Sequence, residues 1–361
     1  MGNKALIAMS GGVDSSVAAY LTQRDGFQCL GVTMKLFSNE DLGRASDRTC
    51  CSLDDVEDAR NVARHLGIPY YVFNFSQEFK TQVMDRFAAA YEGGETPNPC
   101  IDCNRCLKFD RLFQRARELG CEALVTGHYA RIEERSGRYL LRKARDESKD
   151  QSYFLYTMTQ SQLAHTRFPL GELTKGEVRK IAEAQGFRNA HKRDSQDICF
   201  VPGGDYGRFL ENHTGRRWPE GEILDPRGRV LGRHRGAVRY TIGQRKGLGL
   251  AADGPLYVWD KDMEKNTLTV GPEEGLYRRE VFVREVNWIL TDRLTAPRRF
   301  RVKLRSRQRE QEAEVFPLTD GALRLVFDAP QRAPAPGQAA VFYEGDYVAG
   351  GGRLWNGVEK A

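Results

Sequence analysis

The chain has 361 residues, of which 40% are hydrophobic and 29% are charged, and its formal net charge is +6. This composition is that of a soluble globular protein with two or three domains. No apolar run reaches the roughly 20 residues that would span a bilayer, and no signal-peptide pattern opens the chain. We therefore expect a cytoplasmic protein without a membrane partner.

The first twenty residues predict a phosphate-binding loop. The apolar run Ala5–Met9 is typical of a buried parallel strand, it stops at Ser10–Gly12, and a helical pattern starts after Asp14–Ser16. Glycines let a backbone approach a phosphate closely, and free N–H groups at a helix start favour an anion. No lysine stands at the Walker spacing, so the common nucleotide loop is not indicated. The alternative is an ordinary glycine-rich strand-to-helix turn.

Strands and helices alternate up to about residue 200. Strands are predicted at 28–34, 70–74 and 123–127, and helices at 54–66, 76–91 and 104–119. Such alternation predicts an α/β fold with a doubly wound parallel sheet. Ligands of these sheets collect beyond the carboxyl ends of the strands, where Ser10, Met34 and Gly127 fall.

The pattern changes from about residue 203. Short β-rich runs separated by glycine and proline turns indicate small barrels or sandwiches, and Pro272–Gly275 is the best linker. We predict a catalytic domain over 1–202, a central β domain over 203–273 and a C-terminal β-barrel domain over 274–361. Arginine and lysine crowd residues 227–246 and 278–309, which favours a phosphate-backbone partner, although solvated strand faces would give the same pattern.

Eight cysteines in a chain expected in the cytoplasm indicate reactive or metal-bound thiols rather than a structural disulfide framework. Cys100, Cys103 and Cys106 follow the stiff segment Thr96–Pro99 at regular spacing. Cys103 leads into a predicted helix, whose N-terminus would lower the pKa of its thiol. Cys199 stands among basic and polar residues. Two reactive thiols beside a nucleotide loop suggest sulfur delivery, in which one cysteine carries a persulfide sulfur and the other attacks it.

The sequence gives no indication of a chemical role for four further cysteines. Cys29 and Cys121 lie at or near strand starts and are interpreted as small buried hydrophobes. Cys50 and Cys51 are loop cysteines without an assigned role, next to the polar loop 38–49.

The motifs together resemble one known family. Ser10–Ser15 is similar to the pyrophosphate loop of N-type ATP pyrophosphatases, which split ATP between the α- and β-phosphates. The chain as a whole resembles the tRNA-specific 2-thiouridylases (the MnmA family), which replace the C2 oxygen of the wobble uridine with sulfur. The resembling strings run through nearly the whole chain: Ser10–Ser15, Thr96–Pro99, Cys103–Asn104, Gly127–Tyr129, Lys149–Leu155, Phe168–Gly171, Asp194–Cys199, Gly243–Gly249 and Pro336–Gln338.

The resemblance implies a role for each matching residue. The ATP site would consist of Ala8, Met9, Ser10, Gly11, Gly12, Val13, Asp14, Ser15, Met34 and Gly127. Asp14 would help to hold the Mg²⁺ that shields the pyrophosphate. Cys103 would be the nucleophile and Cys199 the persulfide carrier. The target base would be surrounded by Asn98, Pro99 and Cys100, and the rest of the tRNA would be contacted by His128, Lys149, Asp150, Gln151, Arg305, Ser306 and Gln338.

Two sulfur routes and three functions stay open. Many relatives carry aspartate where this chain has Cys100, so Cys100, Cys103 and Cys199 could instead hold a [4Fe–4S] cluster with one iron open to external sulfide. A zinc site is a further alternative, and Cys106 is an optional addition to either. The expected partners are the anticodon stem-loops of lysine, glutamate and glutamine tRNAs and a sulfur donor, either a cysteine desulfurase relay or free sulfide. The rival functions are a small-molecule adenylating synthetase of the same fold and a noncatalytic RNA-binding protein.

Overall fold

The computed structural model describes residues 3–37, 53–192 and 198–357. The chain forms two compact units: one consists of Met1–Met84, Pro99–Gly204 and Gly345–Ala349, and the other of Asp85–Asn98, Asp205–Glu344 and Gly350–Ala361. The predicted division into three domains stays a prediction.

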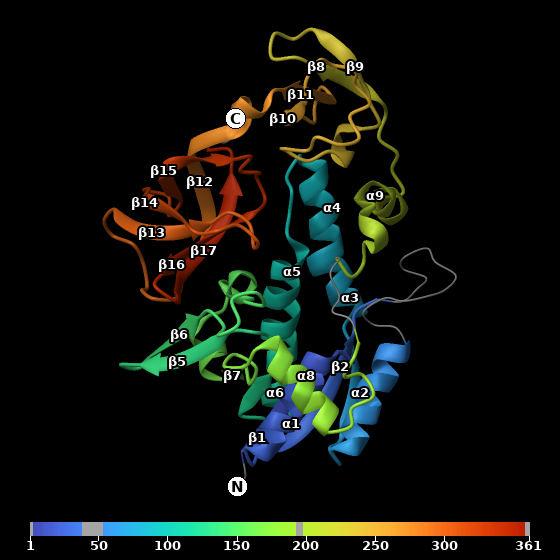
Figure 1. Cartoon of the computed structure of the whole chain (residues 1–361), viewed down its shortest axis with the longest axis vertical. Coiled ribbons are helices and arrows are strands. Elements are labelled where there is room, and N and C mark those ends of the chain that lie inside the picture. The colour runs from blue at the N-terminus through green and yellow to red at the C-terminus, as the bar shows by residue number, and fades with distance from the viewer. Residues whose placement is uncertain (1–2, 38–52, 193–197, 358–361) are drawn as a thin grey trace. The chain divides into compact units, whose positions relative to one another are not determined.

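A five-stranded parallel sheet forms the centre of the first unit (Figure 1). The strand order is β3-β2-β1-β4-β7, with bounds β1 (Lys4–Ala8), β2 (Gln28–Lys35), β3 (Tyr70–Asn74), β4 (Ala123–Val125) and β7 (Thr166–Arg167). The chain runs from β1 outward through β2 and β3, then returns to the other side of β1 for β4. The strand order therefore reverses between β1 and β4, which confirms the predicted doubly wound sheet and places its ligand crevice beyond these two strands.

Helices cover this sheet because their apolar faces need a partner. They are α1 (Val13–Arg24), α2 (Leu53–His65), α3 (Ser76–Phe79), α5 (Pro99–Asp102), α6 (Leu112–Glu118), α7 (Gln160–Ala164) and α8 (Lys175–Ala184). The unit also holds the π-helical segments η2 (Lys80–Met84) and η3 (Cys103–Arg111), the 3₁₀ turns η4 (Ser152–Leu155) and η5 (Pro202–Gly204), and the hairpin β5 (Arg131–Arg135) to β6 (Arg138–Arg142). In the core, Ile7 and Val125 pack with Val17 of α1 and Val178 of α8, all of them fully buried. Each such side chain stabilises the fold by about 1.5–3 kcal/mol.

The second unit begins with α4 (Asp85–Glu92), which continues the helical stretch that starts at α3. It then contains α9 (Tyr206–Thr214), the 3₁₀ turns η6 (Ala237–Arg239) and η7 (Glu273–Leu276), and a four-stranded sheet of order β10-β11-β8-β9. The strands are β8 (Gly221–Leu224), β9 (Val230–His234), β10 (Tyr257–Asp262) and β11 (Thr267–Gly271). Its core is small, with Ile223, Val258, Leu268 and Val270 fully buried.

A closed barrel completes the second unit. Six strands follow the order β12-β15-β14-β13-β16-β17, and β12 also pairs with β17, so the barrel presents no open edge. The strands are β12 (Tyr277–Trp288), β13 (Arg298–Lys303), β14 (Gln311–Pro317), β15 (Leu323–Arg332), β16 (Ala339–Glu344) and β17 (Tyr347–Trp355). The start of β17 belongs to the first unit, where Tyr347 pairs with Arg142 of β6. The expected pair of β domains after the α/β domain is confirmed.

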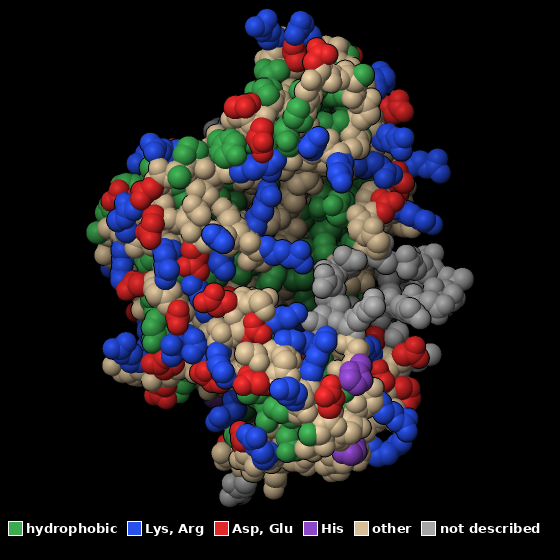
Figure 2. Space-filling view, viewed as in Figure 1, with side chains coloured by type: hydrophobic (Ala, Val, Ile, Leu, Met, Phe, Trp, Pro, Cys, Tyr) green, Lys and Arg blue, Asp and Glu red, His purple; other side chains and the backbone are tan. Residues whose placement is uncertain are grey.

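The arginine-rich stretch 278–309 is partly neutralised on this barrel. The three arginines of β13 form ion pairs: Arg298 with Glu344, Arg299 with Asp328 and Arg301 with Glu310. Basic and acidic side chains accordingly alternate over the face of the barrel in Figure 2. Solvated strand faces account for these three arginines. Within the described ranges, no helix combines the length and apolar character that crossing a bilayer requires.

Candidate functional site

The predicted phosphate loop connects β1 to α1. The Ser15 hydroxyl accepts a hydrogen bond from the Ser10 N–H (3.1 Å) and donates to the Gly12 carbonyl (3.0 Å), and the Ser16 hydroxyl donates to the same carbonyl (3.0 Å). Helix α1 begins at Val13, so the N–H groups of its first turn lie at the loop without partners inside the helix. A loop braced by its own serines at a helix N-terminus is a suitable cradle for a phosphate.

Two glycines allow other segments to approach this loop. Gly11 has φ +74°, and a Cβ there would lie 2.3 Å from the carbonyl oxygen of Asp55. Gly127 follows β4, and a Cβ there would lie 2.8 Å from the backbone N of Ser15. The backbone at Gly127 therefore lies directly against the start of α1. Met34 lies near the end of β2, the strand that pairs with β1, and the ATP site as a whole stays a prediction.

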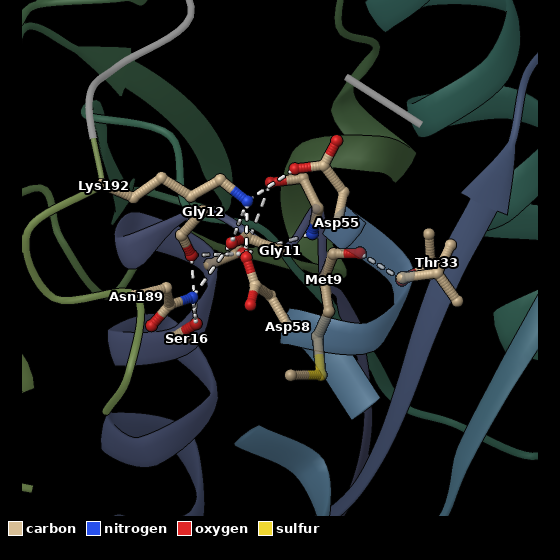
Figure 3. A network of polar contacts seen from close by, with 12 residues as sticks. Met9, Gly11, Gly12, Ser16, Thr33, Asp55, Asp58, Asn189 and Lys192 are labelled. Atoms are coloured by element: carbon tan, nitrogen blue, oxygen red, sulfur yellow. Dashed lines mark hydrogen bonds and ion pairs between the residues drawn. The ribbon is translucent and has the colours of Figure 1, made fainter. Parts of the chain in front are cut away.

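Asn189 fastens the loop from a distant part of the chain (Figure 3). Its side-chain amide donates to the Gly11 carbonyl and to the Ser16 hydroxyl, at 2.9 Å in each case. The residue is only 4% exposed. Both bonds are therefore shielded from water, and the amide fixes the loop to the first turn of α1.

Lys192 makes a second connection to the same loop. Its ammonium group donates to Asp55 (2.7 Å) and Asp58 (2.6 Å) of α2 and, at 3.4 Å, to the Gly11 carbonyl (Figure 3). Burial by itself lowers the pKa of Lys192, but the hydrogen bonds to the two carboxylates outweigh it and raise that pKa above its ordinary value. The lysine is thus a charged link between α2 and the phosphate loop.

We expect Asn189→Ala to loosen the phosphate loop. The substitution removes the buried donor to the Ser16 hydroxyl and leaves the Gly11 carbonyl with only the longer hydrogen bond from Lys192, which costs about 1–3 kcal/mol of the free energy of unfolding. The KM for ATP is expected to rise together with this loss. Urea unfolding and ATP titration measure both effects, with Asn212→Ala, at an exposed position of α9, as the matched control. Unchanged unfolding and unchanged KM would contradict the bracing role.

Asp14 is held by protein donors. Tyr129 donates its hydroxyl to Oδ1 at 2.8 Å, and Lys175, the first residue of α8, lies 2.8 Å from both carboxylate oxygens. Gln151 in turn accepts the Tyr129 N–H at 2.9 Å. Lys175 is 9% exposed, so its ammonium is a nearly buried positive charge at the start of α1. Both oxygens of Asp14 are thus held by protein donors, and its role as a magnesium ligand stays a prediction.

Cys103 does not lie at a helix N-terminus. The helix starts earlier than predicted, at Pro99, and Cys103 is the first residue of the π-helical η3 that continues it. Burial raises the pKa of the Cys103 thiol to about 11, and the nearby Lys108 ammonium lowers it only in part. The expectation of a lowered thiol pKa is therefore wrong for this structure, since desolvation of the thiolate dominates.

The other cysteines divide into buried and accessible groups. Cys29 and Cys121 are 8% and 7% exposed, which confirms them as small core residues. Cys100 is exposed and Cys199 is partly exposed, and the neighbouring Phe200 packs against Phe79 with ring centroids 5.5 Å apart. Cys50, Cys51 and the loop 38–49 lie outside the described residues.

No metal centre can be assigned from these thiols. Within the part of the chain that the structure describes, no three His, Cys, Asp or Glu side chains are grouped so as to hold a metal ion. Cys100, Cys103 and Cys199 as placed here do not form a ligand set, so we assign no step to a cluster. The cluster hypothesis stays a prediction.

Several residues predicted to contact tRNA have partners within the protein. His128 is buried, with Nδ1 2.7 Å from the Thr126 hydroxyl and Nε2 3.5 Å from the Lys108 ammonium. Burial, reinforced by Lys108, holds the pKa of His128 well below its ordinary value, so the ring is neutral. Asp150 accepts hydrogen bonds from the N–H groups of Ala144 and Ser152.

The remaining predicted tRNA contacts lie in both units. Lys149 is partly exposed in the first unit, where Pro99 is buried. In the second unit Asn98 and Ser306 are partly exposed, and Arg305 donates to the Ala333 carbonyl. Gln338, also in the second unit, donates its side-chain amide to the Thr96 carbonyl. The tRNA contacts themselves stay predictions.

Sequence reasoning missed Lys175, Asn189 and Lys192. The only local signal near them is the pattern Thr174-x-x-Glu177, a capping box that the structure confirms at the start of α8. That pattern predicts where the helix begins, but it does not show that Lys175 reaches Asp14, which lies 161 positions earlier in the chain.

A phosphate loop at the switch point of a doubly wound sheet defines a nucleotide-binding protein of the HUP class, and the comparisons agree. The chain matches the tRNA methyl transferase HUP domain over residues 3–203, the tRNA methyl transferase PRC-barrel domain over 207–272 and the aminomethyltransferase beta-barrel domain over 278–354. It belongs to the family of tRNA-specific 2-thiouridylases, as its similarity to full-length relatives shows.

Two of these relatives illustrate the match. The tRNA-specific 2-thiouridylase MnmA of Symbiobacterium thermophilum is 49% identical over 357 residues, covering 97% of this chain and 92% of its own. That of Moorella thermoacetica is 51% identical over 351 residues, covering 97% and 98%. A solved 4-thiouridine synthetase–RNA complex with bound ATP matches 56% of this chain and 46% of its own chain at 22% identity, with a TM-score of 0.38.

Proposed function

We propose that this enzyme uses ATP to replace the C2 oxygen of a tRNA wobble uridine with sulfur. The observation that carries the proposal is the phosphate loop Ser10–Ser15 in a chain of this family. The backbone at Gly127 packs against this loop, and the side chain of Asn189 donates a hydrogen bond to it. The C2 oxygen of uridine is amide-like and leaves poorly, so an activation by ATP must precede the entry of sulfur. The proposed substrates are the lysine, glutamate and glutamine tRNAs, and the proposed location is the cytoplasm.

In the activation step, the uridine C2 oxygen attacks the α-phosphorus of ATP. A C2–O–P bond forms, the bond to the β-phosphate bridging oxygen breaks, and pyrophosphate leaves. The loop N–H groups bind the departing phosphates. Lys175 supplies a fixed positive charge beside them, since its ammonium lies at the start of α1 on Asp14. Magnesium accompanies ATP in this proposal, and no protein ligand is assigned to it.

In the sulfur step, Cys199 carries a persulfide that an external persulfide donor supplies. The Cys103 thiolate attacks the Cys199 sulfur, which forms a Cys103–Cys199 disulfide and releases hydrosulfide. Hydrosulfide adds to C2 and AMP leaves with the former C2 oxygen. A dithiol reductant then restores both thiols. Because desolvation raises the pKa of the Cys103 thiol, the formation of its thiolate needs a proton acceptor in this proposal.

Nucleoside mass spectrometry tests the proposal. The enzyme is incubated with unmodified lysine tRNA, ATP, magnesium and a persulfide donor, and the tRNA is digested. We expect 2-thiouridine at the wobble position, one AMP and one pyrophosphate for each thiolated base, and none of these without ATP. If no thiolated base forms under aerobic or anaerobic conditions, the small-molecule synthetase becomes the better hypothesis. Binding of tRNA without pyrophosphate release would favour a noncatalytic RNA-binding protein.

A further inference from the structure

Three thiols lie along one helix, and the proposed sulfur step uses only that of Cys103. Cys100 belongs to α5 and Cys103 begins η3, and the Asp102 between them has helical dihedral angles (φ −64°, ψ −40°). The two elements therefore form one continuous helix. Cys100 is exposed and Cys103 is partly exposed. The Cys100 thiol, at the start of this helix, takes no part in the proposed sulfur step.

The spacing of Cys100 and Cys103 suits a disulfide. Three residues of an α-helix advance about 4.5 Å along its axis and turn by about 300°, so the two Cα atoms are about 5 Å apart on one side of the helix. Disulfides join Cα atoms about 4.4–6.8 Å apart, with their Cβ atoms about 3.5–4.5 Å apart. Cβ atoms at this helical spacing are about 5–6 Å apart, so the first turn has to tighten. Its N–H groups have no partners inside the helix, so this adjustment breaks few hydrogen bonds.

The electrostatics of Cys103 agree with this proximity. Burial raises the pKa of its thiol and the Lys108 ammonium lowers it, and a negative charge on the Cys100 sulfur raises that pKa further, which requires the two sulfurs to be close. Cys106 has the same kind of influence. It lies in the π-helical part, where one turn takes more residues, so three positions leave its side chain further around the helix from Cys103. Cys100 is the better placed partner.

We infer that Cys100 is the resolving cysteine of the sulfur cycle, which moves the disulfide left by thiolation from Cys199 to the exposed start of the helix. This role rests on the proposed function, which supplies the Cys103–Cys199 disulfide. The Cys100 thiolate attacks the Cys103 sulfur, a Cys100–Cys103 bond forms, and Cys199 leaves as a thiolate that takes up a proton from water. Cys199 can then receive the next persulfide sulfur.

Exposure favours reduction of the second disulfide over the first. Cys199 is only partly exposed, and the next residue, Phe200, is 1% exposed and packs against Phe79. The dithiol reductant reaches the exposed Cys100 sulfur directly. It gives two electrons to the Cys100–Cys103 bond, restores both thiols and becomes a disulfide itself. Reloading of Cys199 and reduction of the disulfide then take place at different sulfur atoms.

Timed peptide mapping of a single turnover tests this role. Enzyme that carries a persulfide receives unmodified lysine tRNA and ATP without reductant, and samples are quenched with acid, alkylated and cleaved before Asp102. This cleavage separates Cys100 from Cys103, so a disulfide between them appears as two linked peptides. Early samples should contain the Cys103–Cys199 disulfide. Later samples should contain the Cys100–Cys103 disulfide in its place, with one disulfide for each thiolated base.

Cys100→Ser should stop at the Cys103–Cys199 disulfide. We expect its first turnover to stay within about twofold of the native rate and its later turnovers, at limiting dithiol, to slow by about tenfold, because an intramolecular thiol reacts faster than a dissolved one. Cys106→Ser removes the thiol three residues to the other side of Cys103 and is the matched control. It should keep the native order of disulfides. Native later turnovers in Cys100→Ser, or a first turnover as slow as the later ones, would overturn the resolving role.

A redox titration distinguishes a failure of this role from a failure of the proposed function. The enzyme is equilibrated with glutathione buffers of increasing oxidation, without tRNA or ATP, and its disulfides are mapped in the same way. The Cys100–Cys103 disulfide should form in the native enzyme and in Cys106→Ser. Its absence from every buffer overturns the resolving role even where thiolation proceeds. If the disulfide forms but the native enzyme makes no thiouridine, the proposed function fails, and the cycle fails with it.

Discussion

Replacement of Cys103 or Cys199 by serine is expected to leave no detectable 2-thiouridine while AMP transfer to the tRNA continues. Serine keeps the size of the side chain but forms neither a persulfide nor a disulfide, so the reaction stops after activation. Adenylation is measured as transfer of label from α-labelled ATP to tRNA. Thiolation is measured by nucleoside mass spectrometry.

The matched control is Cys121→Ala, a buried core position outside the proposed reaction. It should retain both activities. Loss of adenylation in Cys103→Ser or Cys199→Ser, with an intact fold, would show that these cysteines are structural. The sulfur route is decided by a single turnover with an external persulfide. One Cys103–Cys199 disulfide per thiolated base supports the persulfide route, whereas iron retained after anaerobic reconstitution and no disulfide would support the cluster.

Lys175→Met is expected to reduce tRNA-dependent pyrophosphate release by about 10²–10³-fold, the usual cost of removing one preorganised electrostatic group. The substitution removes the ammonium that lies 2.8 Å from both oxygens of Asp14 and leaves that carboxylate as a negative charge facing the incoming phosphates. Lys175→Arg should retain part of the activity, because the positive charge remains.

Lys180→Met serves as the control, since Lys180 lies exposed on the same helix. Unfolding curves separate a loss of fold from a loss of function. Pyrophosphate release at the native rate in Lys175→Met would contradict a role in activation. It would also leave the Lys175–Asp14 pair as a purely structural contact between α1 and α8.

The fold and the phosphate loop were predictable because their signals are local. The spacing of apolar residues indicates the strands and helices. The run Ser10, Gly11 and Gly12 between a strand and a helix indicates the loop within a few residues. The family resemblance then supplied roles for residues such as Gly127, which the structure brings against Ser15. The role of Lys175 had no such signal, since a lysine at a helix start is common and its partner is distant in sequence.

The pKa of Cys103 shows where a local rule failed. The rule that a helix N-terminus lowers a thiol pKa was applied to a helix expected to begin near residue 104. The helix begins at Pro99, a residue well suited to a first helical position, so Cys103 lies beyond the first turn, where desolvation raises the pKa of its thiol although the residue is partly exposed. Burial is a property of the assembled fold, so residue types and spacing alone did not reveal it.

The π-helical turn at Cys103–Arg111 has a consequence for how this segment can evolve. An α-helix turns by about 100° per residue, so adding or deleting one residue between Pro99 and Arg111 would rotate Cys103 to another side of the helix. A π-helical turn has one more residue than an α-helical turn, and such turns occur frequently at functional sites. A single-residue insertion or deletion before Cys103 is therefore expected to displace its side chain more than most substitutions in this segment would.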